Sequence, residues 1–295
     1  MIVKFKRLNC NPQLPSVLKS CLQLIDWRNL DQIKAVINQC LSILDFYQDD
    51  EENGIILATV IDCLSKFCVL CSELPIDRQI ENYGDKCNQD ENDCEIKPKL
   101  TWPMKTVIDI LRSIRTWLSS RSSFVRNSSL ECIDEGLYAL RNIQDEYLPM
   151  VHQTWSSLVL RLNDSSISCR ISSYQTIQRE AEICSSFIRR RFESDAWPHL
   201  RKFLISRAKI TKNMNVESIS NRFLSDDSLR FQSILCETMI RLIAKIGYTS
   251  ERILEEYRDV FWTYYAGDNE QMAMLREKVK ESLKFLPQVD KTQNM

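Results

Sequence analysis

Glycine and histidine are the residues that this chain has least of. Only 5 of its 295 residues are glycine and 8 are proline, less than half of their usual combined share of about 12%. Phosphate-binding loops need closely spaced glycines, whereas these five lie far apart, so neither a dinucleotide-binding motif nor a P-loop can be written. The two histidines, His152 and His199, are too far apart in sequence for an HExxH zinc site. We therefore expect no enzyme, no cofactor and no metal site.

The chain also has almost no net charge and no long apolar run. The 39 lysines and arginines balance 40 acidic residues, which leaves a net charge of -1 and no field that would attract nucleic acid or a membrane. No apolar run approaches the roughly 20 residues of a membrane span, and no signal peptide is evident. Most of the 12 cysteines occupy apolar positions of helix-like segments, as free cysteines do in a reducing compartment. We expect a cytoplasmic or nuclear protein that binds other proteins.

Apolar residues recur at spacings of three and four along most of the chain. In residues 29–46, for example, Leu30, Ile33 and Ile37 begin one stripe and polar residues fall between them. Such a stripe is typical of an amphipathic helix with one buried face. The same pattern predicts eleven helices and no strand. They cover residues 14–25, 29–46, 54–72, 103–118, 123–141, 148–162, 167–184, 196–210, 228–246, 250–264 and 270–286.

Three prolines indicate that these helices form a repeat. Pro103, Pro149 and Pro198 each follow a large apolar residue, and proline suits the first turn of a helix because its missing N–H has no partner there. Their spacings of 46 and 49 residues are close to the 40–47 residues of a HEAT or armadillo unit. The predicted fold class is therefore all-α, a HEAT/armadillo-like α-solenoid of about eleven helices.

Composition divides the chain into three parts. Residues 1–74 are predicted to be helical repeats of the solenoid, and residues 101–295 a C-terminal HEAT-repeat block. Residues 75–100 between them contain seven acids and three asparagines without an apolar period, which predicts a disordered acidic insertion. A shorter polar break at 212–227 is predicted to link two repeats.

One repeat unit stands out at residues 147–184, where two helices meet at Asn163-Asp164. Asp164 precedes Arg170 by six positions, the spacing of the pair with which HEAT repeats commonly tie successive inter-helix turns, and Arg126 enters its own helix in the same way. The residues predicted to form the repeat core are Pro149, Trp155, Leu158, Asp164, Arg170, Phe187, Phe192, Trp197 and Pro198.

A basic run between two phenylalanines is the main candidate for partner binding. Arg189, Arg190 and Arg191 lie between Phe187 and Phe192. They form either a solvated last turn that complements the helix dipole or a basic edge that docks an acidic partner segment through bidentate arginine–carboxylate contacts.

Histidine and tryptophan supply the remaining candidates. His152 is either a packed residue at the edge of the core or a general base without a nucleophile motif, and we include it among the predicted partner-binding residues. Trp102, Trp155, Trp197 and Trp262 are either interface hot spots or inter-repeat core. The pattern favours the core for all four.

A C-x-x-C sequence raises the question of a zinc or redox site. Cys68 and Cys71 form it, and Cys87 and Cys94 follow downstream. The first pair lies inside an apolar helical run without a turn, and the second is spaced more widely than the two to four residues typical of structural zinc sites. Buried thiols are the favoured interpretation.

The segment 147–204 carries a family resemblance. YLPMVHQTWSSLVLRLND, and then FIRRRFESDAWPHLRKFL, resemble the C-terminal region of the largest subunit of the Triple-T (TTT, Tel-Tti) co-chaperone complex of phosphatidylinositol-3-kinase-related kinases. The order of the preceding elements also resembles that of the family: a helix ending in LSILDFY, then the acidic insertion, then the segment from WPMKTVIDIL. The shared residues are Leu148, Pro149, His152, Trp155, Leu158, Phe187, Arg189, Arg191, Phe192, Pro198 and Leu200.

This resemblance implies a function that composition does not reveal. Such subunits are non-enzymatic scaffolds that, with the two other Triple-T subunits, hold kinases of the mTOR, ATM and ATR type for a heat-shock chaperone and its adaptor complex, and so support DNA-damage and growth signalling. Members of the family are much longer, so we expect this chain to correspond to their C-terminal third. A different HEAT-repeat adaptor, of the transport-receptor or phosphatase-scaffold type, has the same composition and stays open as the alternative.

Overall fold

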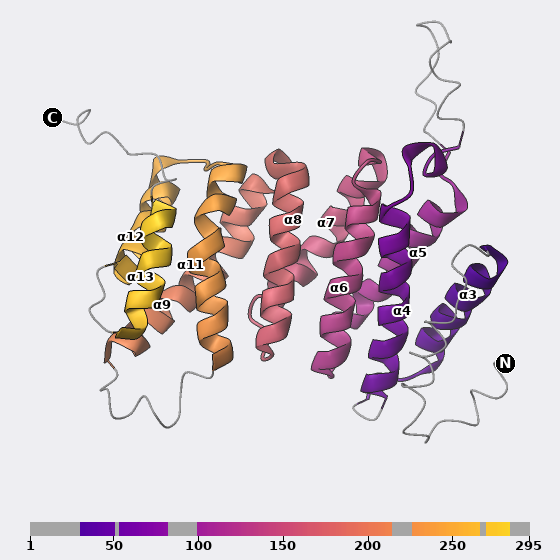
Figure 1. Ribbon diagram of the computed structural model, residues 1–295, viewed down its shortest axis with the longest axis horizontal. Coiled ribbons are helices and arrows are strands. Elements are labelled where there is room, and N and C mark those ends of the chain that lie inside the picture. The colour runs from indigo at the N-terminus through magenta and orange to yellow at the C-terminus, as the bar shows by residue number, and fades with distance from the viewer. Residues whose placement is uncertain (1–29, 51–52, 82–98, 214–225, 266–269, 284–295) are drawn as a thin grey trace, which may run out of the picture. The chain divides into compact units, whose positions relative to one another are not determined.

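The computed structural model describes residues 30–50, 53–81, 99–213, 226–265 and 270–283 (Figure 1). Within these ranges the chain forms α-helices, two short helices of other types and one isolated antiparallel bridge between Ile80 and Leu100. The α-helices are α3 (Leu30–Phe46), α4 (Gly54–Ser72), α5 (Trp102–Trp117), α6 (Ser123–Leu140), α7 (Gln144–Arg161), α8 (Ile167–Arg191), α9 (Trp197–Asn213), α11 (Asp226–Ile246), α12 (Glu251–Tyr265) and α13 (Glu270–Leu283).

These ten helices of the described residues correspond to ten of the eleven predicted ones. The eleventh, at residues 14–25, lies outside the described residues, as does most of the polar break at 212–227. The all-α prediction is confirmed.

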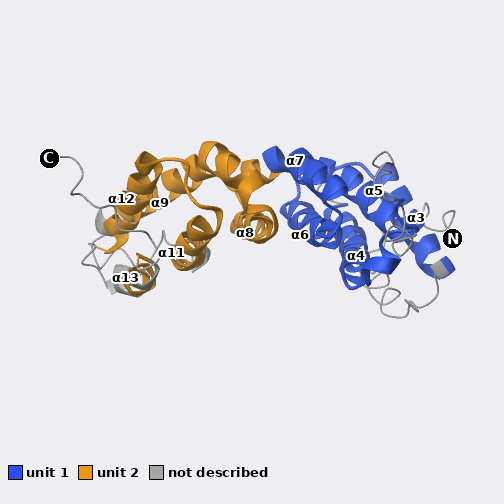
Figure 2. Cartoon of the chain, turned by 90° about the horizontal axis from the view of Figure 1, so that it is seen from above, with its two compact units in different colours: residues 1–157 blue, residues 158–295 orange. Residues whose placement is uncertain are grey.

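The chain divides into two compact units, residues 1–157 and 158–295 (Figure 2). Each unit by itself has two layers of helices. In unit 1, α3, α5 and α7 form the first-helix layer, and α4 and α6 form the second-helix layer. In unit 2, the first-helix layer contains α9 and α12, and the second-helix layer contains α8, α11 and α13. This alternation is the expected arrangement of helix pairs that bury one face on their partner and another on the next pair.

Helix α4 lies at the centre of unit 1. It packs against α3, α5 and α6, and twelve of its 19 residues are buried. By length and composition alone α4 could cross a membrane, so the expectation that no apolar run approaches that length was wrong. Such a helix is also typical of a protein core, and here the apolar residues cover neighbouring helices.

Close packing within unit 1 depends on Gly136 of α6. A β-carbon at this position would lie 2.7 Å from Leu111 Cδ2 of α5, well inside van der Waals contact. The absence of a side chain therefore lets α5 and α6 approach each other closely.

Aromatic side chains fill the core of unit 2. Trp197 packs edge-on against Tyr257 with ring centroids 4.4 Å apart, and Phe231 lies between Tyr174 and Phe203 at 6.2 and 5.0 Å. These edge-to-face and tilted geometries are the arrangements that aromatic pairs prefer. The rings join α8, α9, α11 and α12 into one core.

Two of the three prolines lie in the first turn of a helix as predicted. Pro103 is the second residue of α5, and Pro198 is the second residue of α9, which follows the π-helix η3 (Phe192–Ala196) without a loop. Helix α7 already begins at Gln144, so Pro149 lies inside it. Pro149 and Pro198 are both exposed, and their assignment to the repeat core was wrong. Inside α7, Pro149 leaves the carbonyl oxygen of Asp145 without its helical N–H donor, and on this exposed face water can bond that oxygen.

The insertion at 75–100 is folded at both ends. Residues Ile76–Arg78 form the 3-10 helix η1. Gln79 is fully buried, and its side-chain amide donates to the Leu74 carbonyl oxygen at 2.7 Å. Residues 82–98 lie outside the described residues. The insertion interrupts the sequence but not the packing, because α4 before it packs against α5 and α6 after it.

Trp197→Ala should lower the free energy of unfolding by about 3–5 kcal/mol, because it removes a buried indole and leaves a cavity beside Tyr257. Trp262→Ala, in the same unit but at an exposed indole, should change it by less than about 0.5 kcal/mol. Urea unfolding of both variants, followed by circular dichroism, measures the difference; equal losses would contradict the assigned core.

Candidate protein-binding site

The turn between α7 and α8 is held by Asp164, whose side chain is buried. Its carboxylate accepts hydrogen bonds from Arg161 Nη1 and from the Ser166 N–H, both at 2.9 Å. Arg170 Nε donates to the backbone carbonyl oxygen of Asp164. The predicted Asp164–Arg170 contact therefore exists, but through the backbone oxygen and within one turn.

The turn between α5 and α6 repeats this arrangement 44 residues earlier. Arg126 Nη1 donates to the Ser120 carbonyl oxygen at 2.8 Å, again across six positions. The Ser122 N–H donates to Ser120 Oγ at 3.2 Å, as the Ser166 N–H does to the Asp164 carboxylate. In both turns an arginine one turn into the second helix satisfies carbonyl groups that would otherwise lack partners.

Asp49 ties two successive turns of unit 1 together. Its carboxylate, between α3 and α4, accepts from Ser120 Oγ at 2.5 Å and from the Arg121 N–H at 3.1 Å, between α5 and α6. The tie between turns that was expected from an Asp–Arg pair is thus made here by an aspartate and a serine. Sequence spacing could not reveal it, because 71 residues separate the partners.

Arg189 is occupied within unit 2. Its Nε donates to the carbonyl oxygen of Ile246, the last residue of α11. Gly247 follows with a φ of 75°, and a β-carbon there would lie 3.3 Å from the Arg189 guanidinium. A guanidinium at a helix C-terminus satisfies a terminal carbonyl and complements the helix dipole. Arg189 therefore has a structural role.

The two neighbouring arginines differ from Arg189. Arg190 is exposed, whereas the Arg191 guanidinium lies over the Phe187 ring at 4.3 Å. Phe192 beside them is fully buried. The predicted basic edge is therefore not one surface of three arginines: Arg190 is its exposed member.

The other predicted residues also separate into buried and exposed positions. Trp155 and Leu158 are buried as predicted. His152 is exposed on α7, next to Gln153, which accepts a hydrogen bond from Arg115 at 3.2 Å. Trp262 was expected in the core but is exposed, and its ring lies 5.1 Å from that of Tyr265.

The cysteines of the C-x-x-C sequence are buried in α4. Burial, together with the neighbouring Cys68, raises the pKa of Cys71, so its thiol stays neutral and is a poor metal ligand or nucleophile. Among the described residues no three histidine, cysteine or acidic side chains are grouped to hold a metal ion. Cys87 and Cys94 lie outside the described residues.

Sequence reasoning missed the outward face of α4 and α6, which we call the α4–α6 face. Its α4 row contains Ile55, Asp62, Lys66, Val69 and Glu73, and its α6 row contains Phe124, Asn127, Glu131, Glu135 and Tyr138.

Several contacts fix how the two rows align. Gly54 abuts Ser122 at the start of the helices, and Arg141 Nη2 donates to the Ser72 carbonyl oxygen at 3.1 Å at their end. The two helices therefore run parallel, with Ile55 near Phe124. The apolar members of each row are 14 residues apart and could have been noticed in the sequence, but their exposure depends on which face the neighbouring helices cover.

Paired helices, two layers and a repeated turn define the class of this protein as an armadillo-like helical-repeat protein. A designed armadillo repeat protein, solved in complex with a (KR)4 peptide, aligns over 94% of this chain and 96% of its own, with a TM-score of 0.50 and 15% identity. That likeness concerns the fold alone.

The chain belongs to the family of the TTI1 C-terminal TPR domain, which it matches over residues 72–293. It is 27% identical over 137 residues to the human TELO2-interacting protein 1 homolog and 22% identical over 140 residues to the mouse one. The matched segments are 46% and 48% of this chain but only 13% of each relative, so the chain spans a small part of their length. The family resemblance seen in the sequence is confirmed.

Arg189→Ala should lower the free energy of unfolding by about 1–3 kcal/mol, because it removes a charged hydrogen-bond donor from the end of α11. The exposed neighbour supplies the control: Arg190→Ala should change it by less than about 0.5 kcal/mol. Chemical denaturation of both variants tests this difference. A destabilising Arg190→Ala with a neutral Arg189→Ala would reverse the two assigned roles.

Cys68 and Cys71 should react slowly with N-ethylmaleimide at pH 8, because both thiols are buried and burial also raises the pKa of Cys71. Cys184, which is only half-buried, should react faster, and all should react rapidly in guanidinium chloride. Mass spectrometry of labelled peptides resolves each position. Rapid native labelling at Cys68 and Cys71, or stoichiometric zinc bound there, would contradict this prediction.

Proposed function

We propose that this chain is a non-enzymatic scaffold region of a TTT co-chaperone complex and that it binds a TELO2-type protein. The observation that carries the proposal is the family match over residues 72–293, which includes every described helix from α5 to α13. The names of the human and mouse relatives state an interaction with TELO2.

The described residues have the properties of a binding module. Their helices form two layers within each unit, and repeat folds of this kind use the surfaces of such layers for protein binding. Buried thiols and the absence of a metal-binding group among the described residues support a scaffold over a catalyst.

The finer proposal concerns the clients. The assembly contains this chain, the two other TTT subunits and phosphatidylinositol-3-kinase-related kinases of the mTOR, ATM and ATR type, with a heat-shock chaperone and its adaptor complex. It acts in the cytoplasm and the nucleus, keeps these kinases at their normal level, and so supports growth signalling and the DNA-damage response. Neither nucleic acid nor a membrane is a partner.

Affinity purification of the tagged chain from its own cells, followed by quantitative mass spectrometry, tests this function. A TELO2-type subunit, the third subunit and kinase clients should be enriched over a tagged designed armadillo repeat protein, a control for the general adhesion of solenoids. Enrichment of transport or phosphatase components without a TELO2-type protein would instead establish the alternative of a generic HEAT-repeat adaptor.

A further inference from the structure

We propose that the α4–α6 face of unit 1 docks an α-helix of a partner protein, with lysine or arginine in the middle of that helix and an apolar residue near each end. This inference rests on the proposed binding function and names the chemistry of one partner segment.

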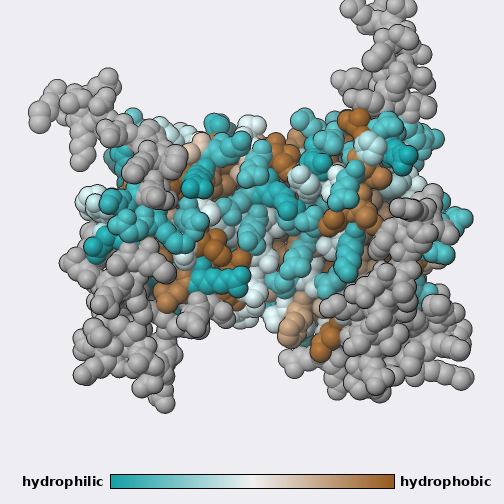
Figure 3. All heavy atoms as spheres, in the orientation of Figure 1, coloured by the Kyte–Doolittle hydropathy of each residue, from teal (hydrophilic) through white to brown (hydrophobic). Residues whose placement is uncertain are grey.

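Exposed apolar side chains lie at both ends of this face. At its start, Ile55 and Phe124 are 58% and 67% exposed. Val69, further along α4, is 36% exposed, and Tyr138 on α6 is half-buried, with the Arg141 guanidinium over its ring at 4.0 Å. Figure 3 shows brown apolar atoms over the lower ends of α4 and α6 and again higher up, with teal atoms between them. Large apolar side chains exposed in this arrangement mark an interaction surface.

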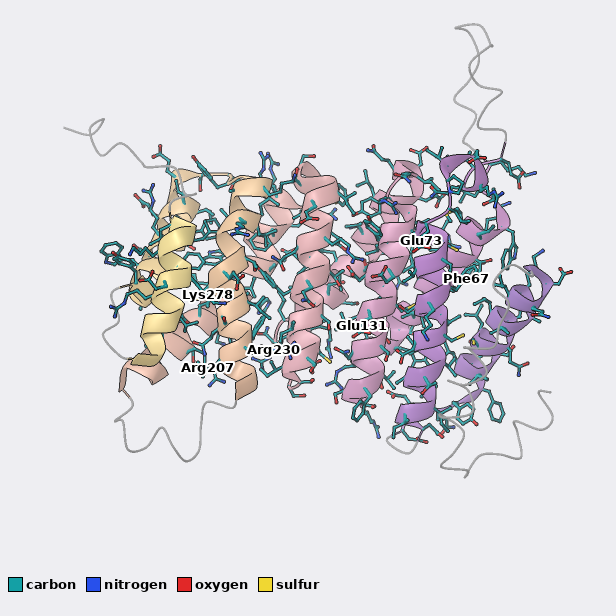
Figure 4. The ribbon with its side chains drawn as sticks, in the orientation of Figure 1. Phe67, Glu73, Glu131, Arg207, Arg230 and Lys278 are labelled. Carbon is teal, nitrogen blue, oxygen red and sulfur yellow. The ribbon has the colours of Figure 1, made fainter. Side chains whose placement is uncertain are left out.

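Carboxylates occupy the middle of the same face. Asp62 of α4 lies near Glu131 and Glu135 of α6, and Lys66 is the basic residue among them. Partial burial, Asp62 and Glu135 all raise the pKa of Glu131, although Asn127 Nδ2 donates a hydrogen bond to its carboxylate at 2.7 Å. Glu131 and Glu73 are labelled in Figure 4. A partner that places positive charge here relieves the repulsion between these carboxylates.

The second-helix layer of unit 2 carries exposed basic side chains on α11. Arg230 and Arg241 are exposed on α11, and Lys278 of α13 pairs with Glu237 at 2.6 Å (Figure 4). A basic segment therefore has an electrostatic match on unit 1 and not on unit 2. The same reasoning disfavours a second copy of the α4–α6 face as its occupant, because the two acidic centres would repel each other.

The spacing of the apolar ends indicates a helix. Ile55 and Val69 are 14 residues apart on α4, which corresponds to about 21 Å, and a partner helix of about four turns covers this length with both apolar residues on one side. An extended segment would bring unpaired backbone N–H and C=O groups against α4 and α6, whose own backbone groups are bonded within the helices. A helix satisfies its backbone internally.

The direct test uses the full chain and a synthetic helix of about 18 residues, with leucines about 14 positions apart and lysines between them. Fluorescence anisotropy should show binding at least about tenfold tighter than that of the same helix with glutamates for lysines. Asp62→Lys with Glu131→Lys should abolish or reverse this preference. The matched control, Asp45→Lys with Asp109→Lys on exposed positions of the first-helix layer, should preserve it.

Equal affinity for the lysine and glutamate helices, or a preference unchanged by the Asp62 and Glu131 substitutions, would overturn the proposal. Light scattering supplies a second test. A concentration-dependent dimer of the free chain that is lost in the double variant Ile55→Ser with Phe124→Ser would also overturn the proposal, because the face would then bind a second copy. Circular dichroism checks that each variant is folded.

A photo-crosslinking amino acid at Phe124 connects this surface to the assembly. In purified complexes it should capture a basic helical segment of another subunit or a client. If the chain recovers no TELO2-type subunit, the scaffold function is refuted, and the helix-binding measurement still tests whether the α4–α6 face docks a basic helix. If the chain recovers that subunit but Phe124 crosslinks only to acidic segments, the docking proposal is refuted and the scaffold function is retained.

Discussion

The packing of α4 against three neighbours is the contact on which unit 1 depends. Helix α4 buries most of its residues against α3, α5 and α6, so only a narrow outward row remains for solvent. Alone, the helix would expose this apolar surface to water, and burying it against neighbouring helices stabilises the unit. The same constraint selects the residues that can bind a partner, because only the uncovered row is available.

Polar contacts at the inter-helix turns set the register of this packing. Arg126 and Arg170 enter their helices in equivalent positions and each donates to a carbonyl group six residues earlier. Asp49 joins one turn to the next in unit 1. Apolar burial has little directional preference, whereas these hydrogen bonds have defined geometry and fix where one pair meets the next.

Charged residues within a few positions of one another have different roles in this structure. Arg189 satisfies the end of α11 and Arg191 covers Phe187, but Arg190 faces solvent. A family resemblance that includes Arg189 and Arg191 is therefore as consistent with maintenance of the fold as with partner binding. The α4–α6 face, by contrast, combines the exposed side chains of Ile55 and Phe124 with a group of carboxylates.

The sequence by itself determined the helices, their pairing into repeats and the family, because apolar periodicity and repeat spacing are local properties of the chain. It placed Trp155, Leu158, Phe192 and Trp197 correctly in the core. It did not determine the exposure of Pro149, Pro198 and Trp262, or the capping role of Arg189. Only the tertiary structure decided these, because exposure depends on which face a distant helix covers, and the Arg189 acceptor lies 57 residues away.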